Sequence, residues 1–394
     1  MENSKPHRGW ISRIGLLAAS AALTFAVVTA PPAQAQTFTV LYTFTGSSDG
    51  KNPFGGVVQD AIGNLYGTTE FGGSSGSGVV FELDNSGTET VLYSFTGGSD
   101  GAYPFSTLLR DATGNLYGTA LKGGTFSDGV VFKVDSGGKE TVLYNFKGGM
   151  TDGCYPSGGL IQDSSGSLYG TTSACGSYGY GTVFKVSRKG KETVLHSFAG
   201  GATDGADPQY TSLLVDKRGS LYGVTVYGGS SGQGVVYRLA KSGKLTVLHS
   251  FLGGSTDGCN PYGAVAMDTA GRLYGTTEFC GSSSSGTVWK VSKKGTEIIL
   301  HSFAGSPSDG ANPLAGVVLD PKGDLYGVTA LGGASGDGTV YRLSKTGTHL
   351  LHSFSLTNGA VPIGGLLRDT KGGLYGTAYA GGSDLFGTVW RLTP

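Results

Sequence analysis

Four cysteines are the residues whose spacing most directly indicates chemistry in this chain. Cys154 and Cys259 each follow a Thr-Asp-Gly triplet, and Cys175 and Cys280 each lie 21 residues further on. Because the two pairs recur at matching positions, we predict the disulfides Cys154–Cys175 and Cys259–Cys280, which implies an oxidising compartment. The loop-entropy estimate gives each about 3 kcal/mol of stabilisation. A zinc site made by all four cysteines is the alternative, and it requires two distant loops to meet.

A second group of candidates is aromatic and acidic. Such residues suit a sugar or a peptide, because rings stack on apolar faces and small polar groups orient the ligand. The segment from Pro208 to Asp216 is one residue longer than its counterparts, which predicts a bulge, a feature that often re-aims side chains at sites. The alternative is that the rings only pack the mouth of the fold. The predicted ligand-binding residues are Phe54, Tyr103, Phe105, Tyr155, Tyr178, Tyr180, Asp207, Tyr210 and Tyr262.

Histidines and a recurrent aspartate raise two metal hypotheses. The histidines take a position that holds Tyr elsewhere in the sequence and are too far apart to share an ion, so we interpret them as half-exposed strand residues and predict no metal site. They are His196, His249, His301 and His352. An Asp-Gly turn explains the recurrent aspartates, with a calcium-binding ring as the alternative; no other cofactor is expected. These turns begin at Asp49, Asp100, Asp152, Asp204, Asp257 and Asp309, with Asn358 in the last copy.

The usual catalytic patterns are missing from the sequence. It has no nucleophile elbow, no phosphate-binding glycine loop and no HExxH motif, so we predict no catalytic residue and favour a non-enzymatic protein. The alternative is a carbohydrate-active or lactone-hydrolysing enzyme that uses Asp207 or Asp204 near the axis and needs converging carboxylates, or a metal, at one mouth.

A sevenfold repeat must position all of these residues. Each copy holds four short segments rich in β-branched and aromatic residues, bounded by Gly, Asp, Asn or Ser, which are typical of strands. Four strands in a period of about 52 residues are the signature of a β-propeller blade. The second segment carries Leu-Tyr-Gly, with its tyrosine at Tyr66, Tyr117, Tyr169, Tyr222, Tyr274, Tyr326 and Tyr375.

The two ends of the repeat array predict how the ring closes. A segment of the fourth type, Thr39 to Phe44, comes first, and the seventh copy stops after its third segment. We therefore predict an all-β, seven-bladed β-propeller with four antiparallel strands per blade, in which the N-terminal strand completes the last blade. The recurrent aromatics of the third and fourth segments are assigned to its core.

Residues 1–35 have the organisation of a signal peptide. Lys5, Arg8 and Arg13 precede an apolar stretch, and Ala33-Gln34-Ala35 fits a signal-peptidase site. An uncleaved anchor helix is the alternative. Residues 36–394 are then one exported domain, periplasmic or extracellular, with no membrane span. With 28 Lys and Arg against 28 Asp and Glu, the chain lacks the positive field of a nucleic-acid-binding protein.

Three recurring motifs carry a family resemblance over nearly the whole chain after residue 36. They are Asn-Leu-Tyr-Gly-Thr-Thr, Gly-Thr-Val-Phe-Lys-Val and Val-Leu-Tyr-Ser-Phe followed by Gly-Gly and Asp-Gly. The chain resembles the GloVer tandem-repeat family of exported bacterial proteins, also called choice-of-anchor repeat proteins. This resemblance implies a secreted or surface propeller and brings no catalytic residues. We expect a monomeric binding or scaffolding module for a glycan or an extracellular protein; a passive surface-layer protein is a further alternative.

Overall fold

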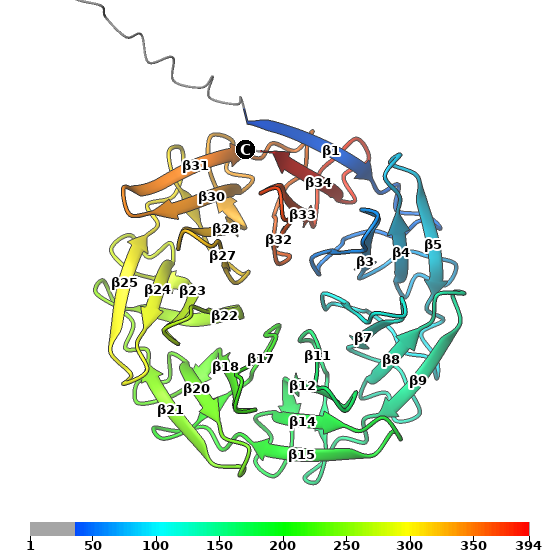
Figure 1. Ribbon diagram of the computed structural model, residues 1–394, viewed down its shortest axis with the longest axis horizontal. Coiled ribbons are helices and arrows are strands. Elements are labelled where there is room, and N and C mark those ends of the chain that lie inside the picture. Colours follow the sequence, from blue (N-terminus) through cyan, green and yellow to red (C-terminus); the bar gives the residue numbers. More distant parts are fainter. Residues whose placement is uncertain (1–35, 394) are drawn as a thin grey trace, which may run out of the picture. The chain divides into compact units, whose positions relative to one another are not determined.

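The short apolar segments of the repeat form seven four-stranded antiparallel sheets arranged around a central axis (Figure 1). This computed structural model describes residues 36–393, so the predicted signal peptide lies outside the described residues. All regular elements in this range are β-strands, and no helix here could cross a membrane. The predicted seven-bladed propeller is thereby confirmed.

Each blade contributes a two-residue innermost strand, except in blade 5, followed by a strand that contains Leu-Tyr-Gly. The innermost strands, in chain order, are β2 (Val58–Gln59), β6 (Leu109–Arg110), β11 (Ile161–Gln162), β17 (Leu214–Val215), β22 (Gly258–Met267), β27 (Val318–Leu319) and β32 (Leu367–Arg368). The second strands are β3 (Leu65–Thr69), β7 (Leu116–Ala120), β12 (Leu168–Thr172), β18 (Leu221–Thr225), β23 (Leu273–Cys280), β28 (Leu325–Thr329) and β33 (Leu374–Ala378).

The two outer strands of each blade carry the core aromatics. The third strands are β4 (Val79–Leu83), β8 (Val130–Val134), β14 (Thr182–Val186), β20 (Val235–Leu239), β24 (Thr287–Val291), β30 (Thr339–Ser344) and β34 (Thr388–Thr393). The outermost strands are β5 (Glu89–Ser94), β9 (Glu140–Asn145), β15 (Glu192–Ser197), β21 (Leu245–Ser250), β25 (Glu297–Ser302), β31 (Gly347–Ser353) and β1 (Thr37–Thr43).

The ring closes as predicted, because β1 pairs antiparallel with β34 in the seventh sheet. Figure 1 shows β1 in blue beside β34 in red. Phe38 stacks on His352 of blade 6 at a centroid distance of 3.6 Å, and Phe44, which follows β1, packs on Phe81 of blade 1 at 5.3 Å. The N-terminal strand therefore fills gaps in both neighbouring blades.

The core consists of inter-blade aromatic contacts. The phenylalanine that ends each outermost strand packs edge-on or tilted against the central aromatic of the next blade, as Phe95 does with Phe132 at 5.0 Å. All of these phenylalanines are fully buried, and burying one such side chain contributes about 1.5–3 kcal/mol. The inner side is crowded as well: a β-carbon on Gly56 would clash with the carbonyl of Gly365 in the adjacent blade.

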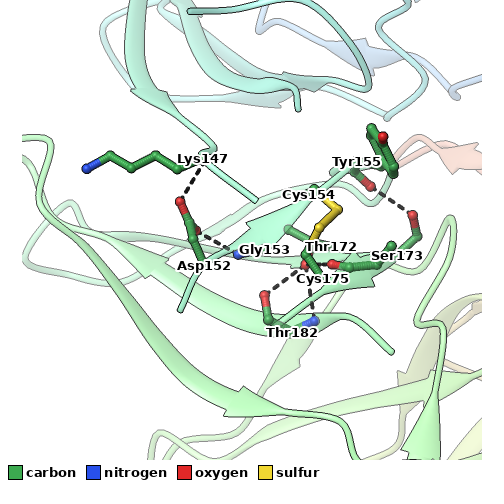
Figure 2. The surroundings of a disulfide bond; sticks show 10 residues. Lys147, Asp152, Gly153, Cys154, Tyr155, Thr172, Ser173, Cys175 and Thr182 are labelled. Atoms are coloured by element: carbon green, nitrogen blue, oxygen red, sulfur yellow. Dashed lines mark hydrogen bonds between the residues drawn. A yellow bond between two sulfur atoms is a disulfide. The ribbon is translucent and has the colours of Figure 1, made fainter. Parts of the chain in front are cut away.

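Both predicted disulfides are present, Cys154–Cys175 and Cys259–Cys280, and no cysteine in residues 36–393 is free. In blade 3 the disulfide joins the segment before the innermost strand to the segment after the second strand, and in blade 5 both cysteines lie in the extensions of β22 and β23. In blade 3 these segments pair as the ribbon β10 (Gly153–Cys154) and β13 (Ala174–Cys175). Figure 2 shows Thr172 beside this ribbon, where its hydroxyl lies 2.8 Å from that of Thr182.

Blades 4 and 6 build equivalent ribbons without cysteines. They are β16 (Gly205–Ala206) with β19 (Tyr227–Gly228) and β26 (Gly310–Ala311) with β29 (Leu331–Gly332). The disulfides therefore reinforce a pairing that the backbone also makes without them.

Candidate functional site

In every blade an X-Pro dipeptide whose first residue is left-handed precedes the innermost strand or, in blade 5, lies within it. Its φ lies between 54° and 61° in all seven blades, a region that suits Asn and Asp better than larger side chains. Asn52 and Asn260 fit, and their amides donate to the carbonyls of Tyr379 and Val226. The seven residues are Asn52, Tyr103, Tyr155, Asp207, Asn260, Asn312 and Val361.

Residues that follow these prolines line a cavity of about 340 Å³ on the ring axis, here called the axial pocket. Its aromatic wall comes from blades 1, 2, 4 and 5, and it includes four of the residues predicted from the sequence. They are Phe54, Phe105, Tyr210 and Tyr262. Apart from Glu278, the remaining lining is small or aliphatic and includes the hydroxyls of Ser106, Thr107, Ser157 and Ser212.

The aromatic wall is a contiguous cluster. The Phe54 ring lies 4.9 Å from Phe105 and 4.7 Å from Tyr210, and Tyr210 is stacked with Tyr262 at 6.3 Å. Tyr379 of blade 7 adds an edge contact to Phe54 at 6.2 Å. Rings from both sides of the axis thus gather at one mouth, which gives stacking surfaces of several orientations.

The predicted irregularity in blade 4 places Tyr210. The extra residue forms a turn at Gln209 and Tyr210, and Tyr210 has a φ of 53°. Its backbone N–H donates to the hydroxyl of Ser157 in blade 3 at 3.1 Å. This anchored turn brings the ring to Phe54 and Phe105 of blades 1 and 2.

Three carboxyl groups, called here the rim carboxyls, lie at this mouth: Glu70, Asp207 and Glu278. Burial raises the pKa of each, to about 6 for Asp207 and about 7 for Glu278. Glu278 lines the axial pocket, and one buried oxygen of Asp207 has no hydrogen-bond partner. Glu70 accepts a hydrogen bond from the Tyr379 hydroxyl at 3.0 Å. The mouth therefore combines aromatic faces with carboxyl groups whose pKa values are raised by burial.

Burial also raises the pKa of Tyr210, and the charges of Glu70 and Asp207 add to this effect. The pKa of Tyr262 is raised by burial and then by the charge of Glu278. Both phenols therefore stay neutral across the physiological range and can donate hydrogen bonds to a ligand.

The other five predicted ligand-binding residues are not among those that line the axial pocket; one of them, Asp207, is the rim carboxyl described above. Tyr103 packs on Phe71 at 5.3 Å, and the ammonium of Lys122 lies 3.5 Å from the ring centre of Tyr155. Tyr178 and Tyr180 are 62% and 50% exposed in the loop between β13 and β14. A site that used all nine residues would extend from the pocket over this loop.

Sequence reasoning missed Glu70, Glu278 and Tyr379. These three share one repeat position, directly after the second strand or, in blade 5, within its extension. The other copies hold Leu121, Ser173, Val226 and Ala330 there. Two acids and a tyrosine among small or aliphatic residues at one aligned position were the available signal.

The aspartates of the Asp-Gly turns make hydrogen bonds within the turn and to the preceding strand. Asp49 accepts from the backbone N–H of Thr45 at 2.7 Å and from the hydroxyl of Tyr42 at 3.0 Å. In later copies a histidine replaces that tyrosine, as with His301 and Asp309 at 3.0 Å. These contacts account for the turn; the calcium hypothesis stays an untested alternative.

Comparisons with known proteins identify a family. The Gloeobacter/Verrucomicrobia repeat matches residues 24–230 and 209–394. Among curated proteins, none matches the chain.

Several solved structures are similar to this chain. The extracellular domain of a protein from B. thetaiotaomicron, described as a one-component system, has a TM-score of 0.55 at 13% identity, covering 89% of this chain and 39% of that one. A gluconolactonase from Xanthomonas campestris has a TM-score of 0.43 at 15% identity, covering 71% of this chain and 82% of that one. A luciferin-regenerating enzyme has a TM-score of 0.43 at 14% identity, with coverages of 73% and 90%. At these identities the first likeness concerns the fold alone.

Proposed function

This chain is a member of the Gloeobacter/Verrucomicrobia repeat family, and from this and its axial pocket we propose that it is an exported, non-enzymatic propeller that binds a glycan. Two disulfides support export, because such bonds persist in oxidising compartments. The observation that carries the binding role is the convergence of four aromatic rings and the carboxyl of Glu278 on one cavity of about 340 Å³.

The chemistry of the pocket favours a sugar ring over a flat apolar ligand. Tyr210 and Tyr262 offer faces for the C–H side of a pyranose, while Glu278 and the serine hydroxyls offer acceptors and donors for its hydroxyl groups. The volume is at the lower end for small-molecule sites, so we propose recognition of one sugar ring or a glycan end.

The test is a glycan array probed with the mature chain, followed by calorimetry on each glycan that binds. Tyr262→Ala and Glu278→Gln should each weaken binding at least about tenfold, or 1.4 kcal/mol, because the first removes a stacking face and the second replaces one carboxylate oxygen by an amide NH2 that cannot accept. Phe126→Ala is the control, since this ring is 49% exposed in the loop between β7 and β8 and does not line the pocket. Absence of any bound glycan, or binding unaffected by both pocket variants, would contradict the proposal and favour a passive surface protein.

An enzymatic alternative is favoured by one observation. The pKa values of Asp207 and Glu278, raised by burial to about 6 and about 7, suit proton transfer near neutral pH. If the protein hydrolyses glycosides or lactones, and Asp207→Asn or Glu278→Gln abolishes turnover while leaving the fold intact, the enzyme would replace the binding module as the explanation of this pocket.

A further inference from the structure

The outer edge of the ring has a second repeated site, one at each junction between blades. Each junction brings together an aromatic side chain on one outermost strand, the following Asp or Asn of the turn, and a residue at the start of the next outermost strand. In three junctions the set is Tyr, Asp and Glu; the first contains Tyr42, Asp49 and Glu89.

The junction between blades 4 and 5 differs in its chemistry. It combines His249 on β21, Asp257 in the turn and Glu297 on β25. Within residues 36–393 this is the one junction with an imidazole and two carboxyl groups. The junctions of His196 and His301 have Leu245 and Thr348 in place of the glutamate, as the pairing registers show.

The three side chains present their ligand atoms to one point. One nitrogen of His249 and one oxygen from each of Asp257 and Glu297 all lie within 4.8 Å of one another. The Nε2 atom of His249 lies 3.5 Å from Oδ2 of Asp257, whereas the equivalent distance is 3.0 Å for both His196 and His301. The histidine that has a glutamate nearby is thus the one that is not closely bonded to its aspartate.

Two side-chain atoms of these residues are buried and have no hydrogen-bond partner: Nε2 of His249 and Oε1 of Glu297. Leaving buried polar atoms unpaired costs free energy, and a cation between them would satisfy both. The backbone N–H groups of Leu252 and Gly258 donate to Asp257 at 2.7 and 2.6 Å, and these bonds orient its carboxylate.

We propose that His249, Asp257 and Glu297 bind one divalent first-row transition-metal ion, for which Zn²⁺ is the appropriate probe. One imidazole nitrogen and two carboxylate oxygens form a donor set that such ions accept, with water completing the coordination. The ion links β21 of blade 4 to β25 of blade 5. Its ligand Asp257 lies two residues before Cys259 in the chain, so the junction carries a metal link beside a disulfide.

The experiment uses the mature chain without a histidine tag, stripped of metal with a chelator, and titrated with Zn²⁺ by calorimetry and with Co²⁺ by visible absorption. We expect one equivalent to bind and the melting temperature to rise. His249→Tyr copies the junction of Tyr144, Asp152 and Glu192, and Glu297→Leu copies the junction that has Leu245. Both variants should therefore fold, and each should weaken Zn²⁺ binding at least tenfold.

A gain-of-function variant completes the test. Leu245→Glu places a glutamate beside His196 and Asp204, and it should add a second equivalent of Zn²⁺. The proposal is overturned if the unmodified chain binds no Zn²⁺ at about 0.1 mM, which is on the order of the dissociation constant of a weak metal site. It is also overturned if both loss variants bind as the unmodified chain does, or if Leu245→Glu leaves a single equivalent.

Discussion

The buried aromatic residue of each third strand differs between blades, and these side chains do not contribute equally to stability. Phe81, Phe132 and Phe184 are replaced in later blades by tyrosine or tryptophan, and all are buried. The hydroxyls of Tyr237 and Tyr341 are buried and have no hydrogen-bond partner. Because a buried unpaired hydroxyl loses its bonds to water, the tyrosines stabilise this position less than phenylalanine would.

Tyr237→Phe should therefore raise the free energy of unfolding by about 1 kcal/mol, measured by urea denaturation. Tyr93→Phe is the control with the opposite expected sign. The Tyr93 hydroxyl donates a hydrogen bond to Asp100 at 2.8 Å, so its removal should lower the free energy of unfolding by a similar amount. Equal effects of the two substitutions would show that the hydroxyl of Tyr237 is satisfied after all.

The outermost strands share an electrostatic property. Four of them begin with Glu89, Glu140, Glu192 or Glu297, and each glutamate has one buried oxygen without a partner. Burial, helped by the charge of the neighbouring turn aspartate, raises the pKa of each to about 7. The folded chain thus holds these protons more tightly than the unfolded chain, where a glutamate titrates near 4.3. Their contribution to stability is complete below about pH 4 and is lost as the pH rises through about 7.

In Glu140→Leu the free energy of unfolding should fall less steeply as the pH rises, because the substitution removes one of the four groups. It copies Leu245, which begins β21. The free energy of unfolding is measured by urea titration at intervals from pH 5 to pH 8. Thr141→Ala, at the exposed next position, should leave the slope unchanged. An unchanged slope in Glu140→Leu would contradict the raised pKa of this group.

At the scale of the whole molecule, the ring is closed by β1, which pairs antiparallel with β34. Without β1, the long edge of β34 would be open, and an open edge invites pairing with another chain. The gap left by the buried Phe44 alone should cost about 3 kcal/mol or more.

A chain that begins at residue 45 should therefore melt at a lower temperature and form oligomers, measured by circular dichroism and light scattering. The control begins at residue 36. A synthetic peptide of residues 36–44 should restore the monomer by strand addition. A truncated chain that is monomeric and equally stable would show that closure by β1 contributes little.

The fold and the disulfides could be predicted because seven copies state the same pattern and the cysteines recur at matching positions. Phe54, Phe105, Tyr210 and Tyr262 could be found because large rings stand where inner strands crowd the axis. The acids Glu70 and Glu278 were missed although their aligned position carried a signal, because the local pattern does not show that the residue after the second strand reaches the same mouth as the rings. The extra residue of blade 4 predicted an irregularity near Tyr210, but which rings touch across the axis depends on strand twist, which no local pattern encodes. The binding roles themselves stay predictions.

The pairing of β1 with β34 also has a consequence for biosynthesis. Thr37 and Thr393, which are hydrogen-bonded across this pair of strands, are 356 residues apart in the chain. The ribosome therefore makes one half of this contact hundreds of residues before the other. While the intervening blades are synthesised, β1 has no strand to pair with, so the ring can close only after synthesis has reached β34. During that interval the nascent protein depends on chaperones or rapid folding.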